Sequence, residues 1–177
     1  MRITGGYLKG RILKTLPGQL TRPTPGRIRE ALFSILQHDL ENTDVLDLFA
    51  GSGALAIEAV SRGAASAVLV EKNERAAAII RQNLAKCELQ LRLIVADYKK
   101  GSEILAGEMK KFDLIFADPP YGTVTADDLG LLLVKFSLFK PDGFLIMEHS
   151  GDYEPPQETI IKTRRFGDSA ISILRYE

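Results

Sequence analysis

Short apolar runs alternate with stretches of helical character from residue 44 onward, and this alternation limits the possible folds more than any other feature. The runs are VLDLFA, AVLVE, LRLIVAD, DLIFADPP and GFLIMEH. Continuous runs rich in β-branched and aromatic residues are typical of strands buried on both faces. Helices are predicted between them in ALAIEAVSRG, NERAAAIIRQNLAKC and DDLGLLLVKF, the last followed by a turn at KPDG. The alternation predicts an α/β, Rossmann-like fold with a mostly parallel sheet and helices on both faces.

The two ends of the chain depart from this alternation. The C-terminal stretch ETIIKTRRFGDSAISILRYE has two strand-like runs around Gly167 and Asp168, which predicts an antiparallel hairpin at the sheet edge. With the five runs above, the hairpin brings the expected sheet to seven strands. Residues 27–40 place apolar side chains at helical spacing and predict an amphipathic helix. Residues 1–26 are rich in glycine, proline and bases, which is typical of a loop or small hairpin.

The composition is that of one globular domain. Of the 177 residues, 45% are hydrophobic and 26% are charged, which excludes a disordered chain. No apolar run approaches the ~20 residues of a membrane span, so we expect a cytoplasmic protein with no membrane partner. Cys87 is the only cysteine, and His38 and His149 fit no metal-ligand spacing, so neither a disulfide nor a metal site is predicted. We expect a monomer.

The net charge of zero hides an asymmetry along the chain. Residues 1–30 carry seven bases and one acid, whereas the remainder carries 16 bases and 22 acids. Such a difference predicts a polyanion-binding arm on an acidic body, although a solvated basic face would look the same. We therefore divide the chain, which we expect to be a single domain overall, into a basic arm, residues 1–26, and an α/β body, residues 27–177. The bases expected to contact the polyanion are Lys9, Arg11, Arg22 and Arg27.

The stretch VLDLFAGSGALAIEA predicts a strand, a glycine turn and a helix, the arrangement that holds a nucleotide cofactor. Gly51 and Gly53 allow the backbone to approach a ligand closely, and the first N–H groups of the helix face it. Glu71 ends the next strand, 20 residues after Gly51, where a carboxylate can bind a ribose diol. NAD-binding domains share this spacing, so the turn alone does not identify the cofactor.

Two further carboxylates favour S-adenosylmethionine over NAD. Asp47 lies late in the first strand, where it would attract an ammonium group, whereas a pyrophosphate would gain nothing from it. Asp97 ends the third strand and could accept a hydrogen bond from an adenine amine. S-adenosylmethionine carries an ammonium, a ribose and an adenine, which match Asp47, Glu71 and Asp97 in that order. Each carboxylate taken alone could equally be a solvated strand end.

The fourth run ends in Asp118-Pro119-Pro120-Tyr121, at the sheet edge where ligands of open α/β folds bind. The two prolines are rigid and remove two N–H donors, so the corner offers acceptors, namely the Asp118 carboxylate and the Pro119 carbonyl. Two acceptors that hold an exocyclic amine would localise its lone pair toward an electrophilic methyl group. Tyr121 would stack on the base, which must be unpaired or flipped out of a helix to reach it.

These motifs resemble the class I S-adenosylmethionine-dependent methyltransferases that modify exocyclic amines. RITGGYLKGRIL, TRPTPGRIREALFSIL and the closing RRFGDSAISILRYE are similar to the bacterial 16S ribosomal RNA guanine-N2 methyltransferase family. The resemblance implies methylation of one guanine N2 amine of 16S rRNA, within partly assembled 30S subunits, with no DNA partner. It implies that Asp47, Gly51, Gly53, Glu71 and Asp97 hold the cofactor and that residues 118–121 hold the guanine amine.

Three alternatives share part of this pattern. An adenine-N6 or cytosine-N4 DNA methyltransferase has the same corner but usually needs a separate recognition domain. An NAD-dependent oxidoreductase leaves the corner and the basic arm unexplained, and an inactive RNA-binding assembly factor needs no intact corner. One departure from the family pattern is Pro25-Gly26, where a threonine and an aspartate usually precede the first helix.

Overall fold

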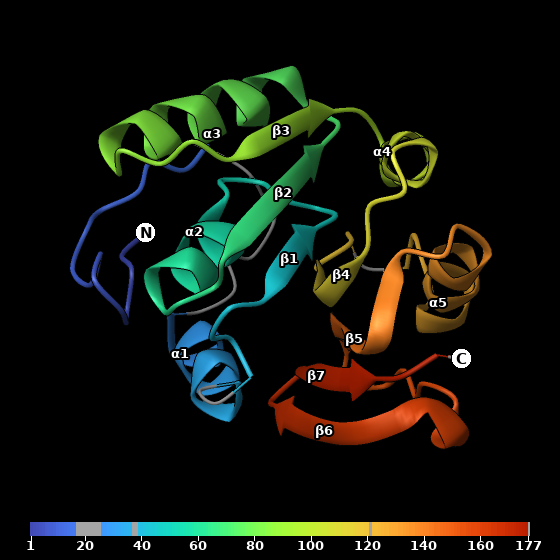
Figure 1. Ribbon diagram of the computed structural model, residues 1–177. Coiled ribbons are helices and arrows are strands. Elements are labelled where there is room, and N and C mark those ends of the chain that lie inside the picture. The colour runs from blue at the N-terminus through green and yellow to red at the C-terminus, as the bar shows by residue number, and fades with distance from the viewer. Residues whose placement is uncertain (17–25, 37–38, 121, 177) are drawn as a thin grey trace.

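Seven strands form one sheet in the order β3-β2-β1-β4-β5-β7-β6 in the computed structural model, which describes residues 1–16, 26–36, 39–120 and 122–176 (Figure 1). The strands are β1 Asp44–Asp47, β2 Ser66–Glu71, β3 Arg92–Val95, β4 Phe112–Ala117, β5 Phe139–Ser150, β6 Ile160–Phe166 and β7 Ser169–Leu174. Strands β1 to β5 pair in parallel, whereas β7 is antiparallel to both β5 and β6. The predicted sheet and its C-terminal hairpin are confirmed.

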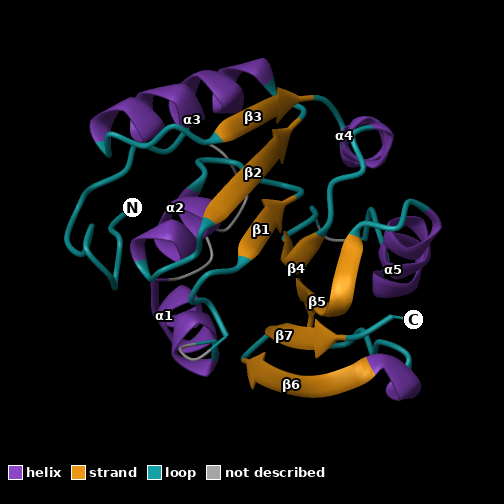
Figure 2. Cartoon of the chain, in the orientation of Figure 1, coloured by secondary structure: helices purple, strands orange, loops and turns teal. Residues whose placement is uncertain are grey.

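Helices cover both faces of the sheet (Figure 2). They are α1 Gly26–Ile35, α2 Ala54–Ser61, α3 Glu74–Lys86, α4 Tyr98–Gly107 and α5 Ala126–Lys135, with a short 3₁₀ turn at Gln157–Thr159. Buried residues of α1, α2 and α3 form one apolar cluster, and those of α4 and α5 form a second. The strands between them are almost continuously apolar because they are buried on both sides.

Two local features differ from what the sequence patterns indicated. Helix α4 has no counterpart among the predicted helices, because Gly101 interrupts its pattern. A Cβ at Gly101 would lie 2.6 Å from Val70 Cγ1, so the glycine is what lets α4 pack closely on β2. The predicted turn at KPDG lies inside β5, where the pairing with β4 shifts register and Asp142 has a φ of 62°. The segment is therefore an irregular strand start.

Residues 1–16 pack onto the domain and do not extend from it. Arg2 and Ile12 form an antiparallel bridge, which agrees with the predicted small hairpin. Ile3, Leu8 and Leu13 are buried in the same apolar cluster as α1 and α2, so the core continues across residue 26. No helix in the described ranges has the length and apolar character needed to cross a membrane.

Candidate active site

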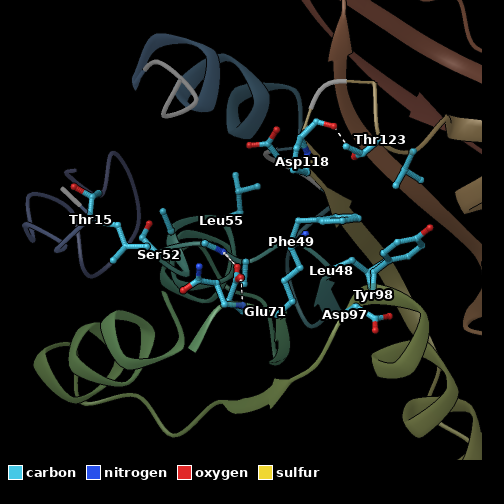
Figure 3. A pocket seen from close by; sticks show the side chains of 18 of the residues that line it. Thr15, Leu48, Phe49, Ser52, Leu55, Glu71, Asp97, Tyr98, Asp118 and Thr123 are labelled. Atoms are coloured by element: carbon cyan, nitrogen blue, oxygen red, sulfur yellow. Dashed lines mark hydrogen bonds between the residues drawn. The ribbon is translucent and has the colours of Figure 1, made fainter. Parts of the chain in front are cut away.

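A cavity of about 410 Å³ opens at the carboxyl ends of the central parallel strands (Figure 3). Five of the predicted site residues line it: Gly51, Glu71, Asp97, Asp118 and Pro120. Met1, Thr15, Arg29, Phe49, Ser52, Leu55, Tyr98 and Thr123 also line it, and the sequence patterns did not single them out. The cavity lies where open α/β sheets bind ligands, because adjacent strands send their following segments to opposite faces there.

The glycine turn follows β1 and leads into α2. Gly51 and Gly53 have φ values of 54° and 78°, a backbone region that favours glycine. Gly51 lines the cavity, whereas a Cβ on Gly53 would lie 3.1 Å from Leu69 Cδ2 in the core. The structure therefore brings Gly51 to the cavity, while Gly53 faces the core below the turn.

The Glu71 carboxylate is fixed by two backbone donors. Its Oε2 accepts from the Gly51 N–H at 2.7 Å, and its Oε1 accepts from the Asn73 N–H at 2.8 Å. Each carboxylate oxygen has a second lone pair, so both can still accept from a ligand hydroxyl. A carboxylate held this way is already oriented before any ligand binds.

Asp47 lies beneath the turn and does not line the cavity. Its side chain is 1% exposed, and neither oxygen accepts a hydrogen bond of normal geometry from the described residues. Burial raises the pKa of Asp47 to about 7, and the nearby N–H groups of Phe49 and Ala56 offset only part of that rise. The expected contact between Asp47 and a cofactor ammonium remains a prediction that this geometry does not favour.

Asp97 follows β3 and caps α4. Its Oδ1 accepts from the backbone N–H groups of Lys99 and Lys100, at 2.9 and 3.0 Å. Both capping bonds use Oδ1, which leaves Oδ2 for a ligand. Beside it, the rings of Phe49 and Tyr98 have centroids 5.3 Å apart. Together these groups offer an aromatic surface and one acceptor, which suit a flat heterocycle with an amine.

Asp118 follows β4 directly and faces the cavity from the side opposite Glu71 in Figure 3. Pro119 is buried, whereas Pro120 is exposed at the cavity rim. The Pro120 carbonyl accepts from the Thr123 N–H at 3.2 Å and from its hydroxyl at 2.6 Å, which closes the turn after the prolines. Tyr121 lies outside the described residues.

Two of the four bases expected to contact RNA have side chains that the structure describes. Lys9 and Arg11 are exposed, and Arg11 also donates to the Lys86 carbonyl at 3.0 Å. Arg22 lies outside the described residues, as does the side chain of Arg27, whose backbone is in α1. The structure therefore offers two of the four predicted cations as solvent-facing groups.

Arg29, one of the seven N-terminal bases, is not a surface residue. It is 2% exposed, and its Nε lies 2.9 Å from Glu58 Oε2 in a buried ion pair. A count of charges along the sequence treats every arginine as exposed, so it could not find this pair. Among the described residues, no group of three or more His, Cys, Asp or Glu side chains is arranged to hold a metal ion.

Comparisons with known proteins agree with this architecture. A protein-family profile described as Conserved hypothetical protein 95 matches residues 1–175. YlbH of Bacillus subtilis is 33% identical over 99% of this chain and 98% of its own length. Ribosomal RNA small subunit methyltransferase D of Haemophilus influenzae is 30% identical over 94% of this chain and 89% of its own. The solved structure of a Thermus thermophilus hypothetical protein has a TM-score of 0.87 and 30% identity, and covers 99% of both chains.

Proposed function

The chain belongs to the Conserved hypothetical protein 95 family, and we propose that it transfers a methyl group from S-adenosylmethionine to the N2 amine of a guanine in 16S ribosomal RNA. The name of the H. influenzae relative, a small-subunit rRNA methyltransferase, supports this reaction and this substrate class. The observation that carries the proposal is one cavity shared by Glu71, Asp97 and Asp118. Glu71 and Asp97, which we expect to hold the cofactor, therefore line the same cavity as Asp118, which we expect to hold the target amine.

The lining residues fit the shape and polarity of S-adenosylmethionine. Phe49 and Tyr98 would offer an aromatic surface to the adenine, and Asp97 would accept from its amine. Glu71, held by the Gly51 N–H, would accept from the ribose hydroxyls. When bound, the cofactor supplies an electrophilic methyl group on a sulfonium. Asp47 and Gly53 lie beneath the glycine turn and do not line the cavity.

Asp118 is the residue that we assign to the target amine. Its carboxylate would accept one N2 hydrogen, and the Pro119 carbonyl would accept the other, so that the nitrogen lone pair points at the methyl group. The exocyclic nitrogen is not acidic before attack, and its proton becomes labile only after the new N–C bond makes it cationic. Asp118 therefore acts first as an oriented acceptor, and the proton leaves to solvent after transfer.

The N-terminal segment supports an RNA substrate. Lys9 and Arg11 are exposed there, and the neighbouring Tyr7 is 69% exposed. Cations with an exposed aromatic ring are suited to phosphate contacts and base stacking. We assign Lys9 and Arg11, together with Arg22 and Arg27, to the RNA, and we expect the natural substrate to be a partly assembled 30S subunit.

Nucleoside analysis of reacted subunits tests the proposal. The protein is incubated with isotopically labelled S-adenosylmethionine and 30S subunits from a strain that lacks the corresponding methylation, and the RNA is digested to nucleosides. We expect labelled N2-methylguanosine from wild type and none from Asp118→Ala. Labelled N6-methyladenosine would instead identify adenine as the target base, and labelled N4-methylcytidine would identify cytosine. Failure to label either subunits or naked 16S rRNA would overturn the proposal.

A further inference from the structure

Strand β5 carries a carboxylate, Glu148, beside Asp118. Where β4 pairs in parallel with β5, Ala117 lies opposite Met147, and Asp118 and Glu148 are the next residues along the chain. Side chains alternate between the two faces of a strand, so both carboxylates project to the face opposite that of Ala117 and Met147. Both residues are half-buried. They are therefore neighbours on one face of the sheet.

Asp118 and Glu148 line one small crevice. The other residues that line it are apolar and come from α1, α2 and three strands: Leu32, Leu55, Phe116, Ala117, Ile146 and Ile171. Its volume is about 10 Å³, which is room for about one water-sized group, so a base could present only its edge there. Asp118 and Leu55 also line the larger cavity, so the crevice adjoins the space assigned to the cofactor. An apolar surface on which a few polar groups converge is typical of a ligand site.

The Watson–Crick edge of guanine carries the N1–H donor directly beside the N2 amine. The proposed function gives the two N2 hydrogens to the Asp118 carboxylate and the Pro119 carbonyl, which leaves N1–H in need of an acceptor. An ionised glutamate accepts hydrogen bonds and donates none. Enzymes that flip a base out of a helix read this edge by hydrogen bonds. Glu148, next to Asp118 on the neighbouring strand, is therefore the acceptor that N1–H requires.

The same carboxylate disfavours the other bases that carry an exocyclic amine. Beside that amine, adenine and cytosine have an unprotonated ring nitrogen, which is an acceptor. A carboxylate that faces this nitrogen sets two lone pairs against each other with no hydrogen between them. Specificity in proteins often comes from such an unfavourable contact with the wrong ligand as well as from a good contact with the right one.

We propose that Glu148 selects guanine by accepting the N1–H of the flipped target base. The inference rests on the proposed function, since it assumes that Asp118 holds the N2 amine. Glu148 determines specificity and takes no proton, because the hydrogen that it holds stays on N1 while the methyl group moves to N2. A hydrogen bond to a charged acceptor is stronger than a neutral one, so this contact weighs heavily in the choice of base.

An analogue of the target base tests this contact. 30S subunits are reconstituted with ligated 16S rRNA that carries either guanine or 2-aminopurine at the nucleotide that wild type methylates, and kcat/KM is compared. 2-Aminopurine keeps the 2-amine, but its N1 is unprotonated. We expect wild type to prefer guanine by at least about 10²-fold, because a site built to accept a hydrogen rejects an analogue that lacks it. In Glu148→Gln this ratio should fall below about tenfold, because the amide can turn to donate to N1 or to accept from N1–H.

Glu154→Gln is the matched control. Glu154 is exposed shortly after β5 and lines neither the crevice nor the larger cavity, so its replacement should keep the wild-type ratio. Glu148→Ala also removes the carboxylate and should repeat the Glu148→Gln result, whereas Glu148→Asp retains a carboxylate and should keep more of the preference. 2-Aminopurine also lacks O6, but that loss is the same for every variant, so the change in ratio reports the contact with N1.

Two results would overturn the inference alone. A wild-type ratio near one would show that no group reads N1–H, and this measurement decides even if neither Glu148→Gln nor Glu148→Ala folds. An undiminished ratio in a folded Glu148→Gln or Glu148→Ala variant would assign the contact to another residue. If wild type transfers no methyl group to guanine N2, the proposed function fails as well, which separates that outcome from the first two.

Discussion

Glu71 Oε2 accepts a hydrogen bond from the Gly51 N–H at 2.7 Å, which joins the end of β2 to the glycine turn after β1. The two residues are 20 positions apart in the chain. The bond orients the Glu71 carboxylate and restrains the glycine turn, and both of these line the cavity. Its loss should therefore affect ligand binding more than overall folding.

Glu71→Ala should weaken binding of S-adenosylhomocysteine by about 1–3 kcal/mol, since ribose hydroxyls would lose a buried acceptor. Titration calorimetry measures the change. Glu74→Ala is the control, because Glu74 is exposed at the start of α3. Equal affinities of wild type and Glu71→Ala would refute the ribose assignment.

Asp47 should make stability depend on pH. Folding raises its pKa from 3.8 to about 7, so the native protein keeps a proton that the unfolded chain has released over that interval. The stability linked to this proton is fully present below pH 3.8 and is lost as pH rises toward about 7, by at most about 1.4 kcal/mol per pH unit. Denaturation of wild type and Asp47→Asn at several pH values should show their difference changing over this range and constant above about pH 8. Parallel curves would contradict the pKa shift.

The exposed N-terminal cations should govern RNA binding without affecting the cofactor. Charge reversal by Lys9→Glu/Arg11→Glu should lower kcat/KM for 30S subunits and reduce the slope of log K against log salt by about 1–2, because two phosphate contacts are lost. Affinity for S-adenosylhomocysteine should stay unchanged. Lys110→Glu/Lys111→Glu is the control, since both lysines are exposed just before β4 and lie outside the N-terminal segment. If log K depends equally on log salt in the two double variants, Lys9 and Arg11 do not contact the RNA and are solvated surface residues.

Asp118 variants separate an acceptor from a general base. Asp118→Ala should abolish methyl transfer with cofactor affinity nearly intact. Asp118→Asn keeps one oxygen acceptor, so we expect activity about 10²-fold below wild type, the scale of one charged transition-state contact. Single-turnover methylation of 30S subunits measures both. If the two variants are equally inactive while folded and binding cofactor, Asp118 is a base.

Gly101 should be sensitive to a single methyl group. Gly101→Ala would place a Cβ 2.6 Å from Val70 Cγ1 and should destabilise the protein by about 1–3 kcal/mol through overpacking. Gly107→Ala in the same helix meets no atom within 4 Å and should be neutral or stabilise by up to about 1 kcal/mol. Urea denaturation of the two variants checks the contrast. Equal stabilities would mean that α4 is not held closely against β2.

The sequence by itself determined the sheet, most helices and much of the cavity. Apolar strands, glycine turns and helix caps are local patterns, because they arise from periodicity and backbone geometry within a few residues. Glu71, Asp97 and Asp118 were predictable for the same reason, since each lies at or just after the end of a strand and the carboxyl ends of parallel strands meet at one edge. Asn73 likewise caps α3 as its sequence position indicates.

Only the tertiary structure decided which charges are inside. Arg29 lies in a run of bases, yet it is buried because Glu58, 29 residues away, meets it within the core. Asp47 lies at the end of the strand that leads into the expected site, yet its carboxylate is enclosed below the turn. Burial and ion pairing depend on which distant segments come into contact, and residue type and local spacing carry no information about those contacts.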